Sequence, residues 1–292
     1  MITNYPKATL YISEINLLES FRTLIRFQHP NLKFSGWSKG QKLFQYLSEN
    51  PEHKIEGLSE GDQINFTPDI KLNVLYPSKD CIEHFDTYFK KELDRITKRV
   101  GEIESRIDPN SSNYLSIDFS KNFNDQSVAL EALNKDFNTM YLADLELESH
   151  GGIKYVLENA FSSGREYDVF KVPHHGSKTS FNKDLWTDVL KKPTTDQILK
   201  LTCWKIGKHY LPEKEIVDEM LKISENIFCT GVPDKETIKI NNKTKKYYNN
   251  SNLKFSVAAH NYGSISVHFD YEKNELSLNT KIPAVHVTEL FN

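Results

Sequence analysis

The sequence has few cysteines. Its 292 residues include only Cys81, Cys203 and Cys229, and no two of them form a CxxC pair. This scattered, odd count excludes a disulfide framework and a zinc ribbon, and it favours buried thiols in a reducing compartment. The apolar runs are only a few residues long, far short of the roughly 20 residues that a membrane span needs. No basic segment followed by an apolar stretch opens the chain, so we expect no signal peptide and a cytoplasmic location.

The sequence also lacks an excess of either charge. It has 37 basic and 40 acidic residues and a net charge of −3, so no global positive field indicates nucleic-acid binding, although a local basic groove is not excluded. Hydrophobic residues make up 38% and charged residues 26% of the chain, as in soluble globular proteins. Without a repeat, a low-complexity tract or a Gly/Ser linker, we predict one domain spanning residues 1–292.

Strands and helices alternate along the chain, which predicts a layered α/β protein. Apolar spacing indicates helices at 14–28, 40–49 and 82–106. The last of these carries one apolar stripe on a charged rod, typical of an amphipathic surface helix, with a partner-binding helix as the alternative. Two short apolar runs between Gly57 and Pro77 predict a hairpin-like strand pair.

Two apolar strands carry the candidate site. The run TMYLA ends in Asp144, and DVFKVP leads into His174, His175 and Gly176, with a predicted helix between the strands. A strand–helix–strand crossover makes the strands parallel, so both should end at the same sheet edge. Carboxylate and neutral imidazole together suit zinc, manganese or iron. Taken alone, Asp144 fits a helix cap and the histidine pair fits surface chance, but jointly they favour a metal site.

Three blocks support a resemblance to a known family: NDQSVALEAL, MYLADLELES and YDVFKVPHHGSKTS. They resemble the second half of a metallo-β-lactamase-fold hydrolase, most similar to the soluble domain of ComEC-like DNA-uptake proteins. The likeness is strongest over 113–181 and extends loosely over about residues 5–270. It implies a four-layer αββα metallo-β-lactamase-like sandwich.

The same resemblance assigns roles to individual residues. Asp144 would bridge two metal ions, Zn²⁺ or Mn²⁺, and either His174 or His175 would be an imidazole ligand. Three residues would line the rim, where the lysine would meet a substrate phosphate or carboxylate: Ser177, Lys178 and Thr179. Asn124 and Asp125 match the family's strand start and are expected to contact substrate.

The sequence departs from the family at its main signature, His-x-His-x-Asp-His. No two of the ten histidines stand two residues apart, and the first strands resemble what normally follows that signature. We therefore expect an N-terminally incomplete sandwich: a fragment, a chain whose protein partner supplies the missing ligands, or a degenerate relative. His209-Tyr-Leu-Pro replaces a later Gly-His-Pro of the family, so we expect no role for His209.

These residues predict a metal-dependent hydrolase that acts on a phosphodiester or nucleic acid through a metal-activated water. The substrate class follows from the resemblance alone, because one fold hosts many chemistries. The alternative is a non-catalytic or partner-completed subunit that retains the fold without the first metal site. With at most a partial dinuclear site, we expect the isolated chain to have little or no activity.

Overall fold

The structure of the chain is a computed structural model. It describes residues 9–26, 32–35, 46, 49, 53–105, 115–118, 124–134, 137–147, 152–162, 165–183, 186, 197–206, 209–230, 264–270, 275–281 and 285–286. The predicted helix at 40–49 falls almost entirely outside these residues.

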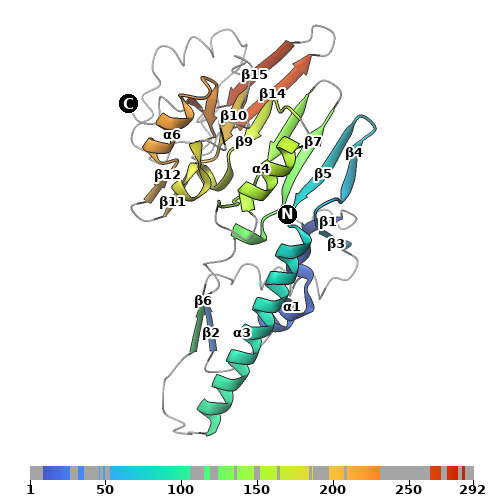
Figure 1. The fold of residues 1–292 in the computed structure, drawn as a ribbon, viewed down its shortest axis with the longest axis vertical. Helices are drawn as coiled ribbons and strands as arrows, with labels where there is room; N and C mark the ends of the chain where they lie inside the picture. Colours follow the sequence, from blue (N-terminus) through green and yellow to red (C-terminus); the bar gives the residue numbers. More distant parts are fainter. Residues whose placement is uncertain are drawn as a thin grey trace.

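A mixed sheet of eight strands forms the centre of the molecule, in the order β16-β13-β10-β9-β8-β7-β5-β4 (Figure 1). Its strands are β4 (Gln63–Thr67), β5 (Ile70–Tyr76), β7 (Ala129–Leu133), β8 (Asn138–Tyr141), β9 (Val169–Lys171), β10 (Ile198–Leu201), β13 (Ile227–Cys229) and β16 (Val285–His286). The strands β8, β9, β10 and β13 run parallel to one another. The helix α4 (Gly152–Ser162) makes the crossover from β8 to β9, so the predicted crossover is confirmed.

The two faces of the sheet can be compared row by row, because successive side chains of a strand point to opposite sides. One row across the parallel strands is completely buried: Met140, Phe170, Leu199 and Ile227. The next row is partly exposed: Tyr141, Lys171, Lys200 and Phe228. The buried row belongs to the same hydrophobic core as Ile153, Val156 and Leu157 of α4. The hydrophobic core therefore lies on the side of the sheet that α4 covers.

The predicted amphipathic helix is confirmed as α3 (Lys79–Ser105). Its apolar stripe is buried where it faces the short helix α1 (Glu19–Arg26), and the rings of Phe21 and Phe89 lie 4.8 Å apart. Figure 1 shows the C-terminal part of α3 extending away from the eight-stranded sheet.

The predicted helix at 14–28 is interrupted. Residues Glu14–Leu17 form the 3₁₀ turn η2, and α1 starts only at Glu19. The residue between them, Leu18, has a ψ of 133°, an extended value that no α-helix can contain. Periodicity alone did not reveal this break, because the apolar spacing continues across it.

The hairpin predicted between Gly57 and Pro77 is present as the antiparallel pair β4–β5. Its register shifts between Asn65 and Thr67, which marks a β-bulge in β4. The strand before it, β3 (Ile55–Leu58), pairs in parallel with β1 (Leu10–Ser13), near the N-terminal end of the described chain.

The remaining strands form two-stranded pieces. They are β2 (Leu32–Ser35) with β6 (Leu115–Asp118), β11 (Trp204–Ile206) with β12 (His209–Leu211), and β14 (Ser264–Asp270) with β15 (Glu275–Lys281). The α/β content agrees with the sequence prediction. Within the described ranges only one large sheet occurs, so the second sheet of an αββα sandwich stays a prediction. No helix in those ranges has the length and apolarity that crossing a membrane requires.

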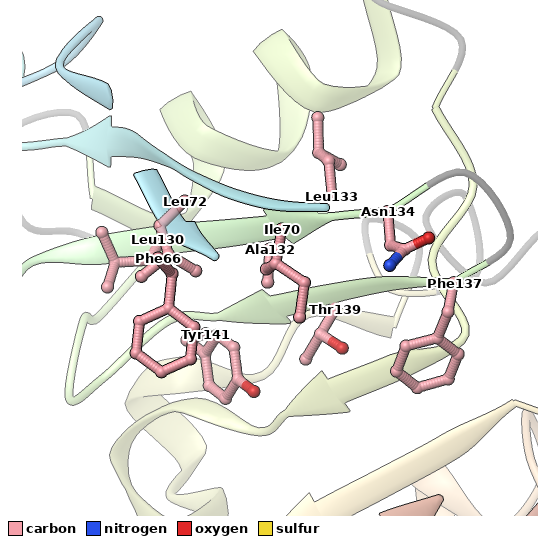
Figure 2. Close-up of a pocket in the computed structure, with 10 residues that line it drawn as sticks. All are labelled: Phe66, Ile70, Leu72, Leu130, Ala132, Leu133, Asn134, Phe137, Thr139 and Tyr141. Carbon is pink, nitrogen blue, oxygen red and sulfur yellow. The ribbon is translucent and has the colours of Figure 1, made fainter. Parts of the chain in front are cut away.

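The face of the sheet that bears Tyr141 is hollowed by an apolar groove of about 410 Å³ (Figure 2). It lies over β4, β5, β7 and β8, and its lining residues are Phe66, Ile70, Leu72, Leu130, Ala132, Leu133, Asn134, Phe137, Thr139 and Tyr141. None of the sequence-predicted site residues is among them. The groove and the candidate site are therefore different features of the same sheet.

Candidate metal centre

The turns that follow β8 and β9 are tied together at the carboxyl ends of these strands. The backbone N–H of His174 donates a hydrogen bond to the carbonyl oxygen of Ala143, at 3.1 Å. The backbone N–H of Asp144 donates to Oγ of Ser127, at 3.4 Å. In open α/β sheets, ligands bind outside the carboxyl ends of the strands, which is the position of this pair of turns.

The backbone of these turns is strained. Ala143, His174 and His175 have φ angles of 47°, 42° and 56° and are the non-glycine residues with positive φ in the described chain. Such conformations cost of order 1–3 kcal/mol each and persist where the surrounding structure enforces them, typically at functional sites. All three lie at or beside the predicted ligands. The backbone strain is therefore found at the candidate site that the strand ends predict.

Gly176 continues the left-handed run with a φ of 75°. A Cβ atom here would lie 2.8 Å from Cδ2 of Leu201 and 3.0 Å from Cβ of Pro212. Glycine is therefore required here for two reasons: the positive φ angle, and the close approach of the segments that carry Leu201 and Pro212.

His175 faces Asp144. Its Nε2 lies 3.7 Å from Oδ1 of Asp144, and both side chains are partly open to solvent. The predicted convergence of these two strand ends is therefore present in the structure.

The segment after β10 holds the other side of the His175 ring. Nδ1 of His175 lies 3.0 Å from the carbonyl oxygen and 2.8 Å from Oγ1 of Thr202. A carbonyl oxygen only accepts hydrogen bonds, so this contact assigns the proton to Nδ1. The indole of Trp204 stacks on the imidazole, with ring centroids 6.2 Å apart and an interplanar angle of 19°.

Burial lowers the pKa of His175, and the charge of Asp144 opposes this only in part. The ring is therefore neutral near pH 7, with the proton on Nδ1 and a lone pair on Nε2 directed toward a carboxylate. Two electron-rich atoms that face one gap favour a cation between them. A ligating histidine also commonly donates its other ring N–H to a backbone carbonyl, as His175 does to Thr202.

His174 is held differently. Its Nδ1 lies 2.9 Å from Oε1 of Glu146, 3.0 Å from Oγ of Ser177 and 3.1 Å from Oγ1 of Thr179. Nδ2 of Asn124 is 3.4 Å from its Nε2 and 2.7 Å from Oε1 of Glu146. These contacts occupy both ring nitrogens, so His174 fits a structural role better than a ligand role.

The Asp144–His175 pair fits a metal ion as part of a site. Two atoms that bind one zinc ion each lie about 2.0–2.2 Å from it, so they stand at most about 4.4 Å apart. The 3.7 Å between Oδ1 and Nε2 is within this limit. Among the residues that the structure describes, no group of three or more His, Cys, Asp or Glu side chains is placed to hold a metal. The pair would supply two of the roughly four ligands that a zinc site needs.

Lys171 brings a cation toward the carboxylate. Its Nζ donates a hydrogen bond to the carbonyl oxygen of Val172, at 2.8 Å. Burial lowers the pKa of Lys171, whereas electrostatic interactions with Asp144 and Cys229 raise it. A half-buried ammonium that interacts electrostatically with Asp144 adds positive potential at this sheet edge.

The expected rim is corrected in part. Ser177 is only 6% exposed and bonds His174, so it does not line the rim. Lys178 and Thr179 are exposed, but Nζ of Lys178 lies 3.3 Å from Glu213 and 2.9 Å from Glu215. A substrate phosphate would have to displace these carboxylates.

Two more of the predicted residues, Asn124 and Asp125, lie in the 3₁₀ turn η4 (Asn124–Gln126). Asn124 contacts Glu146 and His174, whereas Asp125 interacts electrostatically with the buried Tyr76–Cys81 pair. The strand β12 places the backbone of His209 outside the turns that carry Asp144 and His175.

Three residues of the site were not predicted from the sequence: Thr202, Trp204 and Glu146. Thr202 and Trp204 follow β10, the parallel strand beside β9. Because β10 ends at the same sheet edge as β8 and β9, its position could have predicted Thr202 and Trp204. Comparisons of the chain with protein-family models, curated proteins and solved structures found no match.

Proposed function

We propose that the chain is a metal-dependent hydrolase of phosphodiesters whose metal centre is built on Asp144 and His175. The observation that carries this proposal is the Nε2 lone pair of His175 facing the Asp144 carboxylate at 3.7 Å. The resemblance of the surrounding sequence blocks to ComEC-like metallo-β-lactamase-fold proteins supports a phosphodiester or nucleic-acid substrate.

Each residue of the site has a defined part in this function. His175 is fixed by Thr202 and Trp204 in the tautomer that offers Nε2. Asp144 contributes the negative charge that a cation needs, and Lys171 adds a cation beside it that favours an anionic substrate. When bound, a divalent ion supplies Lewis-acid chemistry for attack of water on a phosphodiester.

A second candidate is a non-catalytic or partner-completed subunit. The observation that favours it is the lack of a third metal-ligating side chain near Asp144 and His175 in the part of the chain that the structure describes. Both candidates share the metal-binding pair and differ in whether this chain alone turns over substrate.

Metal titration and hydrolysis assays on the purified chain test both candidates. We expect Mn²⁺ or Zn²⁺ to bind in calorimetry and bis(p-nitrophenyl) phosphate to be hydrolysed slowly, with the rate abolished by EDTA. Asp144→Asn and His175→Gln should remove both signals, whereas His174→Gln is the matched control and should keep them.

Three outcomes separate the candidates. Metal binding without turnover above the Asp144→Asn variant would favour the partner-completed subunit. Equal metal affinity in wild type, Asp144→Asn and His175→Gln would overturn the metal centre itself. Fast, chelator-sensitive turnover would show that the chain supplies more ligands than this pair.

A further inference from the structure

Two cysteines that are 26 positions apart in the sequence are in contact near the candidate metal centre. Sγ of Cys203 and Sγ of Cys229 lie 2.8 Å apart, and both thiols are reduced in the structure. Cys229 ends β13, and Cys203 follows the neighbouring strand β10, with Leu201 and Cys229 paired in register. The sulfur atoms need to approach by about 0.8 Å more to reach the 2.03–2.05 Å of a disulfide bond.

Cys203 lies between the two residues that hold His175. Thr202 bonds Nδ1 of His175, and Trp204 stacks on its ring. Because these three residues are consecutive, a displacement of Cys203 moves both contacts of the imidazole. The third cysteine, Cys81, belongs to α3 and lies 2.7 Å from the hydroxyl of Tyr76.

We propose that Cys203 and Cys229 are an oxidative modification site, and that their disulfide displaces the segment Thr202–Trp204 and loosens its hold on His175. Formation of the disulfide is independent of the proposed function. Its effect on metal affinity rests on that function.

The chemistry needs a two-electron oxidant, for which we name hydrogen peroxide. Cys203 is 8% exposed and Cys229 is 0% exposed, so the Cys203 thiolate attacks first. Its sulfur takes one peroxide oxygen, the O–O bond breaks, and the leaving hydroxide takes up a proton to become water.

The sulfur of Cys229 then attacks the sulfenic acid on Cys203. The S–S bond forms, the S–O bond breaks, and the leaving hydroxide takes the Cys229 proton to give a second water. Two thiols lose two electrons and two protons in total, and one peroxide is reduced to two waters.

The test treats the reduced full chain with hydrogen peroxide and maps the cysteines by mass spectrometry after alkylation in denaturant. We expect a peptide pair joined through Cys203 and Cys229, with Cys81 recovered as the alkylated thiol. Cys81→Ser is the matched control and should form the same link, whereas Cys203→Ser and Cys229→Ser should not. Recovery of both thiols alkylated, or of Cys203 as a sulfinic acid, would overturn the proposal.

A second measurement tests the coupling to His175 without any metal. Oxidation should change the tryptophan emission of wild type, and the change should be absent in Trp204→Phe. The disulfide should also lower the Mn²⁺ affinity about tenfold, the lower end of what loss of a residue supporting a metal ligand costs. A disulfide that leaves the Trp204 emission unchanged would overturn the coupling. If neither redox state binds Mn²⁺, the proposed function fails, while the disulfide and the emission change still decide this inference.

Discussion

The surroundings of His174 and His175 differ more than their adjacent positions suggest. Both residues have left-handed backbones, and both follow β9. The side chain of His174 is enclosed by hydrogen-bonding groups, three of them on Nδ1 alone. His175 instead presents Nε2 to Asp144 across a gap of 3.7 Å.

The difference arises from residues that are distant in the sequence. The partners of His174 come from η4 and from the turns after β8 and β9, whereas His175 is supported from the end of β10. Because both residues have a left-handed backbone, their consecutive side chains enter different surroundings. One histidine thereby bonds to groups of the surrounding turns, and the other presents Nε2 to Asp144.

Removal of each ring in turn should give the largest contrast. His175→Ala deletes one of two metal-binding side chains and should weaken Mn²⁺ binding by at least about 100-fold, more than the 10–100-fold typical of residues that only support a ligand. His174→Ala should change the affinity less than about threefold. Calorimetric titration measures both, and equal losses in the two variants would show that the histidines act together.

A change at Gly176 should disturb both surroundings at once. Gly176→Ala places a Cβ 2.8 Å from the Leu201 side chain at a φ of 75°, so it should destabilise the fold by about 2 kcal/mol. Gly61→Ala is a matched control, because Gly61 also has a positive φ, of 91°, but nothing within 4 Å of the added atom. Its cost should be about 1 kcal/mol. Urea unfolding measures both, and equal costs would mean that crowding at Gly176 does not matter.

Removal of one threonine hydroxyl that contacts a histidine should lower the Mn²⁺ affinity by a smaller factor, and only when that histidine is His175. Thr202→Val removes the 2.8 Å contact to His175 but keeps the backbone carbonyl, so Mn²⁺ affinity should fall about tenfold. Thr179→Val removes the corresponding hydroxyl contact of His174 and should leave the affinity unchanged. The comparison uses the same substitution at both sites, and a larger loss in Thr179→Val would reverse the assignment.

The pH dependence of stability should show the smallest effect. Burial lowers the pKa of His175 from its ordinary value of 6.5. At a pH between the lowered pKa and 6.5, His175 therefore binds a proton in the unfolded chain but not in the folded chain. The contribution of His175 to the free energy of unfolding is therefore complete above pH 6.5 and falls as the pH drops toward the lowered pKa. Urea unfolding from pH 7.5 to pH 5 should show a shallower slope for His175→Asn than for wild type. Parallel slopes would mean that the folded ring titrates like an unfolded one.

Much of the central sheet could be predicted from the sequence. The apolar runs before Asp144 and His174, separated by one helix, were sufficient to predict a parallel crossover. The long stripe of α3 was equally clear, because one apolar face on a charged rod has few other interpretations. The break at Leu18 was not predictable from periodicity, since it depends on one backbone angle.

The site could be located but not resolved from the sequence. Strand ends brought Asp144 and the histidine pair together, yet adjacent residues with the same side chain cannot be distinguished by spacing. That choice depends on the left-handed backbone and on Thr202, which lies 27 positions after His175. The contact between Cys203 and Cys229 was missed for the same reason, because it is set by the pairing of β10 with β13.

The bulge in β4 has a consequence for self-association. In the described sheet, β4 is an edge strand, its sequence Gln-Ile-Asn-Phe-Thr has no charge, and Phe66 is 68% exposed. A flat, uncharged edge of this kind is a template on which a second molecule can add a strand. The shift in register between Asn65 and Thr67 twists the strand just where Phe66 stands, which interrupts the regular row of backbone donors and acceptors. We therefore expect this irregularity to disfavour strand addition and amyloid-like stacking at the edge of the sheet, a task that charged side chains perform in many other proteins.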